Sequence, residues 1–60
     1  MTREEFAELG RDDQLRDRPG RVWRVVAERD GWPTVVIRSG DLVRHVPDRW
    51  ANDYMLLGRR

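Results

Sequence analysis

The sequence contains no cysteine and no lysine, and its only histidine is His45. Without cysteine the chain cannot form a disulfide, and one histidine without cysteine excludes a structural zinc site. We therefore expect no metal and no cofactor. A chain free of cysteine is compatible with a reducing compartment, so the cytoplasm is the default expectation for its location.

Long apolar segments and catalytic motifs are missing as well. No segment approaches the about 20 apolar residues of a transmembrane helix, and the N-terminus lacks the apolar centre of a signal peptide. His45 has no serine or cysteine nucleophile near it by motif, and no glycine-rich phosphate loop is present. A domain this small has little volume for a cleft that positions an acid and a base. We expect neither a membrane protein nor an enzyme, and no small-molecule substrate.

The charges are numerous but nearly balanced. All 12 basic residues are arginine, against 11 acids, and the formal net charge is +1. Residues 1–18 carry six acids and four arginines, whereas residues 19–60 carry five acids and eight arginines. A genome rich in G and C would account for the absence of lysine. The alternative is selection for bidentate contacts to phosphate or carboxylate, which arginine makes and lysine does not.

Residues 21–47 are predicted to form three short strands joined by two tight turns, and the rest of the chain covers or closes them. The segments Val22–Ala27 and Thr34–Ile37 are rich in β-branched and aromatic residues and are bounded by turn residues. A third strand follows, up to Pro47. This stretch makes the chain mainly β.

The second turn is predicted at Ser39-Gly40, because glycine accepts the positive φ that tight hairpins need. A two-residue turn there would place Arg38 opposite Asp41, as an opposite-charge pair across the strands. It would also place Ile37 opposite Leu42.

The first turn is predicted from the faces that it creates, since a shift of one residue moves every side chain to the other face. A two-residue loop at Asp30-Gly31 would put Arg24 and Glu28 on the face of Val35. A three-residue loop, Asp30–Trp32, gives a nearly apolar face instead. Arg44 joins that face, and we expect it at the rim with its guanidinium in water. The apolar members of the predicted inner face are Trp23, Val25, Ala27, Val35, Ile37, Leu42 and Val46.

The reverse of the predicted sheet carries more valine than a fully solvated face needs. Its polar members are Arg24, Glu28, Thr34, Arg38, Asp41 and His45. Its apolar members, called the valine face below, are Val22, Val26, Val36 and Val43. Either a leading helix or a curl of the sheet buries these valines, or they form a partner surface within a ring of arginines.

The leading segment is predicted to contain a helix. Thr2 and Glu5 fit a capping box, Phe6 and Leu9 lie on one helical face, and residues 12–15 would add another helical turn. We expect one domain over residues 1–60. Its parts are an N-terminal helix and acidic leader (1–18), a β-barrel (19–57) and a basic tail (58–60). So short a chain gains little from its core alone, and a partner or a second copy would help its stability.

The end of the chain carries a family resemblance. Pro47-Asp48-Arg49-Trp50 and a helical turn follow the third strand, and Tyr54–Leu57 reads as a last strand. This order resembles the end of an SH3-like small barrel, over roughly residues 19–57. In that family a Pro-Ser-Asn-Tyr turn precedes the last strand, in the place that Pro47–Trp50 occupies here. The resemblance implies a small SH3-like barrel or a curled antiparallel sheet of four to five short strands.

The resemblance also implies a ligand groove lined by Pro47 and Trp50, which Trp32 and Tyr54 could join. The family's Ala-Leu-Tyr-Asp-Tyr segment and tandem tryptophan are absent here, which argues against proline-rich peptides as the ligand. Tryptophan in so small a domain is usually needed in the core, so we expect Trp23 and Trp50 to be buried.

Two functions from different classes follow as hypotheses. The first is a non-catalytic protein-interaction module, an accessory or adaptor protein of the kind that a phage or mobile element encodes, docking a larger partner or itself. Its candidate contacts are Trp32, Pro47, Trp50, Tyr54, Val22, Val26, Val36 and Val43. The second is nucleic-acid binding, with Trp32 stacking on a base. Its candidate contacts are Arg21, Arg24, Arg38, Arg44 and Arg49.

Overall fold

The structure is a computed structural model, and it describes residues 1–28 and 34–58. The chain is mainly β, as the sequence predicts, with a short helix at its N-terminus. In chain order the elements are α1 (Arg3–Ala7), β1 (Gln14–Asp17), β2 (Val22–Glu28), β3 (Thr34–Ser39), β4 (Leu42–Pro47), a 3₁₀ helix η1 (Asp48–Asp53) and β5 (Tyr54–Gly58).

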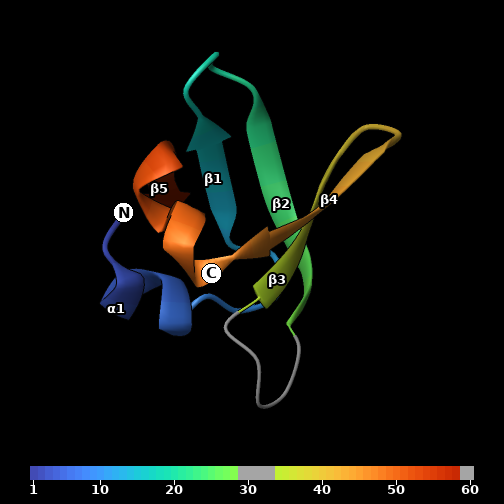
Figure 1. The fold of residues 1–60 in the computed structure, drawn as a ribbon. Coiled ribbons are helices and arrows are strands. Elements are labelled where there is room, and N and C mark those ends of the chain that lie inside the picture. The colour runs from blue at the N-terminus through green and yellow to red at the C-terminus, as the bar shows by residue number, and fades with distance from the viewer. Residues whose placement is uncertain (29–33, 59–60) are drawn as a thin grey trace.

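The five strands form one antiparallel sheet in the order β4-β3-β2-β1-β5. The central strand β2 pairs with β1 on one side and with β3 on the other, so it joins the two halves of the sheet. Strands β4 and β5 are the outer strands, each with one neighbour. Figure 1 shows the β3–β4 hairpin projecting away from the rest of the chain, with α1 and β5 on the opposite side.

Strand β1 was not predicted, and the helical turn predicted for residues 12–15 is wrong. Leu15 lies opposite Trp23 of β2 and opposite Leu56 of β5. It is fully buried between them. Asp12 has a φ of 74°, a left-handed conformation that aspartate tolerates better than most residues and that is incompatible with a right-handed helical turn. The sheet therefore begins at Gln14, inside the predicted leader.

The predicted inner face is confirmed for five of its apolar members. Trp23, Val25, Val35, Ile37 and Val46 are all at most 4% exposed. Successive side chains of a strand point to opposite faces of the sheet, so burial of these alternating residues defines one face as the inner one.

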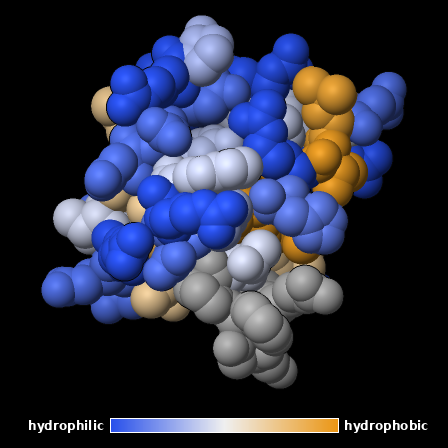
Figure 2. Space-filling model, in the orientation of Figure 1, coloured by the Kyte–Doolittle hydropathy of each residue, from blue (hydrophilic) through white to orange (hydrophobic). Residues whose placement is uncertain are grey.

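Two members of that face do not belong to the buried core. Leu42 is 49% exposed, because it lies at the tip of the β3–β4 hairpin. Figure 2 shows hydrophobic surface gathered on the side from which this hairpin projects. Ala27 lies opposite Val36, because a bulge between Val25 and Ala27 shifts the register by one residue. After the bulge Ala27 shares the face of Val36, which is opposite to the face of Val25 and Ile37.

The turn between β3 and β4 lies one residue further along than predicted. Ser39 pairs with Leu42, which leaves Gly40 and Asp41 as the two turn residues, and Gly40 takes a φ of 58° that favours glycine. The predicted pairs of Arg38 with Asp41 and of Ile37 with Leu42 are therefore wrong. The shift keeps the parity of the strand, so the two faces stay as predicted.

The helix α1 begins with the predicted capping box. The Thr2 hydroxyl accepts from the Glu5 N–H at 3.1 Å, and the Glu5 carboxylate accepts from the Thr2 N–H at 2.9 Å. Phe6 and Leu9 are each 2% exposed and belong to the same buried cluster as Ala51. The leading segment thus closes the core beside η1 and does not cover the valine face.

The 3₁₀ helix and the last strand fall where the sequence predicts them. Pro47 occupies the N-cap position of η1 without a side-chain capping bond, and β5 starts at Tyr54. Among the described residues, no helix is both long enough and apolar enough to cross a bilayer.

Candidate functional site

Four side chains from four strands meet at one end of the sheet. The Trp23 Nε1–H donates to Asp17 Oδ2 at 3.0 Å, and Arg44 Nη1 donates to the Tyr54 hydroxyl at 2.9 Å. The Arg44 guanidinium carbon also lies 4.5 Å from the centre of the Trp23 ring, within cation–π range. Arg44 is exposed, as predicted for a rim residue, but its guanidinium is engaged by these two aromatic side chains.

The turn between β1 and β2 is organised around Asp17. Its Oδ1 accepts from the Arg21 N–H at 2.7 Å, and its carbonyl accepts from the Gly20 N–H at 3.0 Å. Gly20 has a φ of 99°, so glycine is the favoured residue at this position of the turn. These bonds fix Pro19 at the tip of the turn, beside the four side chains described above.

The hydrogen bond from the Trp23 indole is the main reason why the pKa of Asp17 lies below its ordinary value of 3.8. Partial desolvation raises the pKa, and it is outweighed. Backbone N–H groups of Arg21 and Gly20, and then the charge of Arg44, lower it further. Asp17 is therefore charged throughout the neutral range and holds the indole in place as a carboxylate.

Replacing this carboxylate should change how steeply the free energy of unfolding falls as the solution becomes acidic. A group whose pKa is lowered by folding contributes stability that is present above its unfolded pKa and is lost as the pH falls through the folded value. The wild-type protein should therefore lose stability progressively below about pH 4. Asp17→Asn should be less stable at pH 7 and should lose less between pH 5 and pH 2. Urea unfolding midpoints over this range measure both effects.

The control for that experiment is Asp41→Asn, which removes an exposed acid from the β3–β4 turn. This variant should follow the wild-type curve closely. If Asp17→Asn lost as much stability between pH 5 and pH 2 as the wild-type protein does, Asp17 would not be the group whose protonation causes that loss.

A cleft of about 490 Å³ lies next to Trp50, and we call it the aromatic cleft. It is lined by Asp17, Arg18, Pro19, Arg44, Trp50, Asp53 and Tyr54. Trp50 is 43% exposed, so the prediction that it belongs to the core is wrong. The 3₁₀ helix turns its neighbour Ala51 inward, at 1% exposed, and this leaves Trp50 on the outer side. The Arg49 guanidinium carbon lies 5.5 Å from the centre of the Trp50 ring.

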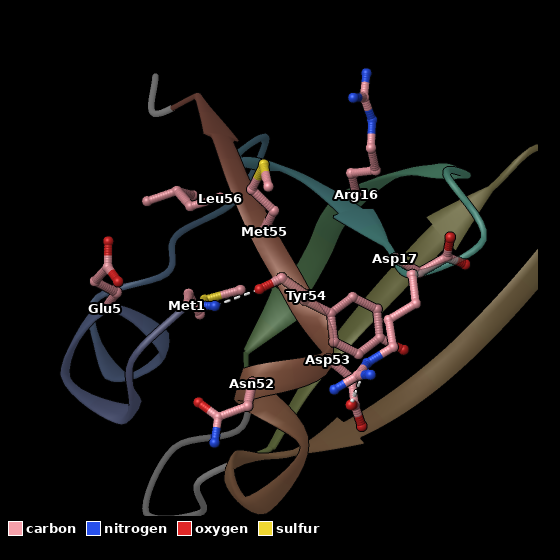
Figure 3. Close-up of a pocket in the computed structure, with 10 residues that line it drawn as sticks. Met1, Glu5, Arg16, Asp17, Asn52, Asp53, Tyr54, Met55 and Leu56 are labelled. Carbon is pink, nitrogen blue, oxygen red and sulfur yellow. Dashed lines mark hydrogen bonds and ion pairs between the residues drawn. The ribbon is translucent and has the colours of Figure 1, made fainter.

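A second cleft, of about 500 Å³, adjoins the first along β5 (Figure 3). The two clefts share Asp17, Arg18, Asp53 and Tyr54 in their linings. The Met1 nitrogen donates to the Tyr54 carbonyl, as Figure 3 shows, and to the Ala51 carbonyl at 3.0 Å. Arg18 Nε donates to Asp53 Oδ1 at 2.9 Å, but both side chains are at least half exposed, so this ion pair adds little stability.

The structure brings together some of the predicted protein contacts. Trp50 and Tyr54 line the aromatic cleft, but Tyr54 is only 5% exposed and belongs to the core, so Trp50 is the more accessible of the two. Pro47 is half-buried at the N-cap position of η1, outside the lining. Trp32 lies outside the described residues. Asp17 and Pro19, which line the cleft, are not among the predicted contacts. Pro19-Gly20 is a common turn dipeptide, but no local pattern indicates which distant residues such a turn meets.

The valine face is neither fully covered nor uniformly open. Val22 and Val43 are 44% and 57% exposed. Val26 and Val36 are half-buried. The predicted alternative in which Phe6 and Leu9 cover these valines is therefore wrong, since both belong to the core on the other side of the sheet.

The five arginines proposed for nucleic acid do not form one surface. Arg24 lies directly opposite Arg38, whereas Arg44 lies opposite Ile37, a residue of the inner face. Arg49 stacks on Trp50, and Arg21 is exposed beside the β1–β2 turn. The predicted set thus divides into separate groups on different sides of the sheet.

Within residues 1–28 and 34–58, no group of three or more histidine and acidic side chains is arranged to hold a metal ion. Comparisons with protein-family models, with curated proteins and with solved structures gave no significant match.

Proposed function

We propose that the chain is a small non-catalytic protein-interaction module with an SH3-like arrangement, and that it binds an extended segment of a partner protein in the aromatic cleft. The observation that carries the proposal is the exposure of Trp50, at 43%, beside Pro19 and Tyr54 in that cleft. Tryptophan and tyrosine are over-represented among the residues that dominate binding energy in protein interfaces. An adaptor that docks a larger partner, or a second copy of itself, would use such a surface.

The order of the elements supports the SH3-like part of the proposal. Strands β3 and β4 form a hairpin, Pro47 begins the 3₁₀ helix η1, and the final strand β5 pairs with β1. In the resemblance that the sequence suggests, the groove for ligands lies beside the turn that precedes the last strand. Trp50 belongs to that turn here.

The chemistry of the cleft supports a partner that contributes apolar side chains. Both oxygens of Asp17 already accept hydrogen bonds, Arg18 pairs with Asp53, and Arg44 donates to Tyr54. Each of these polar groups thus has a partner within the chain, and beside them the cleft offers a ligand Pro19 and the exposed ring of Trp50. Surfaces of this type favour apolar side chains on an extended backbone.

The arrangement of the arginines favours protein over nucleic acid as the partner. Nucleic-acid binding needs cations along one track that follows the phosphates. Arg44 is committed to Trp23 and Tyr54, and it faces away from the side of the sheet that carries Arg24 and Arg38.

Substituting Trp50→Ala should leave the fold intact and weaken ligand binding by about tenfold or more, as at a typical interface hot spot. The probe is a peptide selected from a random 12-residue display library on the wild-type protein, and the readout is its fluorescence anisotropy. The matched control is Met55→Ala, since Met55 is 61% exposed on β5 and lies outside the aromatic cleft. This control should bind as the wild type does.

Two outcomes would contradict the proposal. In the first, the selected peptides bind Trp50→Ala and the wild-type protein equally well. In the second, no peptide is selected, and a labelled oligonucleotide binds with an affinity that falls steeply as salt rises, which is the signature of phosphate contacts.

A further inference from the structure

Arg24 of β2 and Arg38 of β3 lie directly opposite each other, on the face of the sheet that points away from the core. Like charges in this position destabilise an antiparallel pair of strands. Among the side chains that the structure describes, neither arginine belongs to an ion pair, and the one ion pair found there joins Arg18 to Asp53. The sheet thus holds two positive charges side by side, and no side chain in the described part of the chain forms an ion pair with either of them.

These two arginines, which we call the arginine pair, border a shallow cleft of about 440 Å³. Its lining consists of Gln14, Val22, Trp23, Arg24, Val26, Arg38 and Gly40. Arg38 Nε donates to the Gly40 carbonyl at 2.8 Å, which fixes the orientation of the guanidinium. In the described part of the chain its terminal nitrogens have no hydrogen-bond partner. Gln14 lies opposite Arg24 on the next strand and adds an amide to the same row.

We propose that the arginine pair binds a carboxylate side chain of an acidic segment of a protein. Two guanidinium groups on neighbouring strands can hold one carboxylate between them through charge-assisted hydrogen bonds. Charge complementarity therefore selects an acidic occupant. This contact lies outside the aromatic cleft, and it holds whether or not a ligand binds beside Trp50.

The surroundings of the arginine pair favour protein over nucleic acid as the source of the anion. Val22 and Val26 lie in the same cleft, and Val43, which is 57% exposed, lies opposite Arg38. Arginine set among apolar side chains is typical of protein interfaces. The one aromatic residue in the lining, Trp23, is 1% exposed and offers no ring on which a base could stack.

The test uses the full chain labelled with ¹⁵N and follows the Nε–Hε signals of its arginines. The probe is a synthetic peptide of alternating glutamate and valine. The signals of Arg24 and Arg38 should move together and saturate, while that of Arg3 in α1 should stay in place. Arg24→Gln and Arg38→Gln should each weaken binding by about tenfold. Arg3→Gln removes the same charge from an exposed helical position and should bind as the wild type does.

A second readout separates binding from a structural role. Arg24→Glu replaces the like-charge pair with an opposite-charge pair, so the melting temperature of the free protein should rise while binding of the peptide is lost. A residue kept only for stability would show the reverse, a lower melting temperature.

Three results would overturn the proposal. One is the absence of any saturable shift at Arg24 and Arg38. Another is a fall in melting temperature for Arg24→Glu. The third is a shift of the arginine pair by a 12-nucleotide strand but not by the acidic peptide, with steep salt dependence, which would assign the surface to nucleic acid. Trp50→Ala should leave binding of the acidic peptide unchanged, so failure at one surface is distinguishable from failure at the other.

Discussion

Leu15→Ala is expected to unfold most of the protein at room temperature. Leu15 is fully buried between Trp23 and Leu56, at the point where β1 joins β2 to β5. Truncation of a buried leucine to alanine costs about 2–5 kcal/mol, because it removes apolar contacts and leaves a cavity. A core of this size rarely supplies more than about 3–5 kcal/mol, so the loss is comparable to the whole stability.

Far-UV circular dichroism and urea titration would measure that loss. The matched control is Leu42→Ala, the same chemical change at a leucine that is 49% exposed at the hairpin tip. Exposed positions usually change stability by no more than about 0.5 kcal/mol. If the two variants unfolded at similar urea concentrations, β1 would not be part of the core as described.

Trp23→Ala should be at least as damaging, and Trp50→Ala should be nearly silent for folding. Trp23 is 1% exposed, and truncating a buried aromatic residue costs about 3–5 kcal/mol. Trp50 is 43% exposed, so its removal leaves no sealed cavity. The pair compares one chemical change in two environments, and thermal unfolding followed by circular dichroism gives the difference directly.

A third variant separates the volume of Trp23 from its hydrogen bond. Trp23→Phe keeps an aromatic ring for the core and for Arg44, but removes the N–H that donates to Asp17. It should fold with reduced stability, and it should lose less stability between pH 5 and pH 2 than the wild-type protein, because the largest cause of the lowered Asp17 pKa is gone. Unfolding of Trp50→Ala at the temperature at which Trp23→Ala unfolds would show that both tryptophans are structural.

The sequence predicted the sorting of the central strands because that information is local. From β2 to β4, apolar residues recur at every second position, and the inner members Val25, Val35 and Ile37 follow that period. The same pattern survives the error in the β3–β4 turn. Both candidate turns contain Gly40, and moving from one to the other changes partners without changing faces.

Strand β1 could not be predicted from its local sequence, because so short a segment shows no clear alternation of apolar and polar residues. It has four residues, of which Leu15 alone is buried, and a single apolar residue fits a helical turn equally well. What makes it a strand is pairing with β2 and β5, and β5 lies far along the chain. The bulge near Val26 is likewise a feature of two strands together, which neither strand's sequence specifies.

The candidate site was predictable only in part, for a similar reason. The aromatic residues of the last turn, Trp50 and Tyr54, were identified from their position before and in the final strand. Which of Trp50 and Ala51 points inward depends on the 3₁₀ geometry of η1, and a general preference for buried tryptophan gave the wrong answer. The part played by Asp17 depends on Trp23 reaching it across the sheet.

The hydrogen bond between Arg44 and Tyr54 joins β4 to β5, the two outer strands of the sheet. Unprotected outer strands invite edge-to-edge aggregation, because their free backbone groups can template another chain. The Arg44–Tyr54 hydrogen bond ties the two edges together at one point, and this should hinder the approach of an incoming strand there. Loss of Arg44 would then open a route to fibrils or swapped dimers even in a protein that still folds.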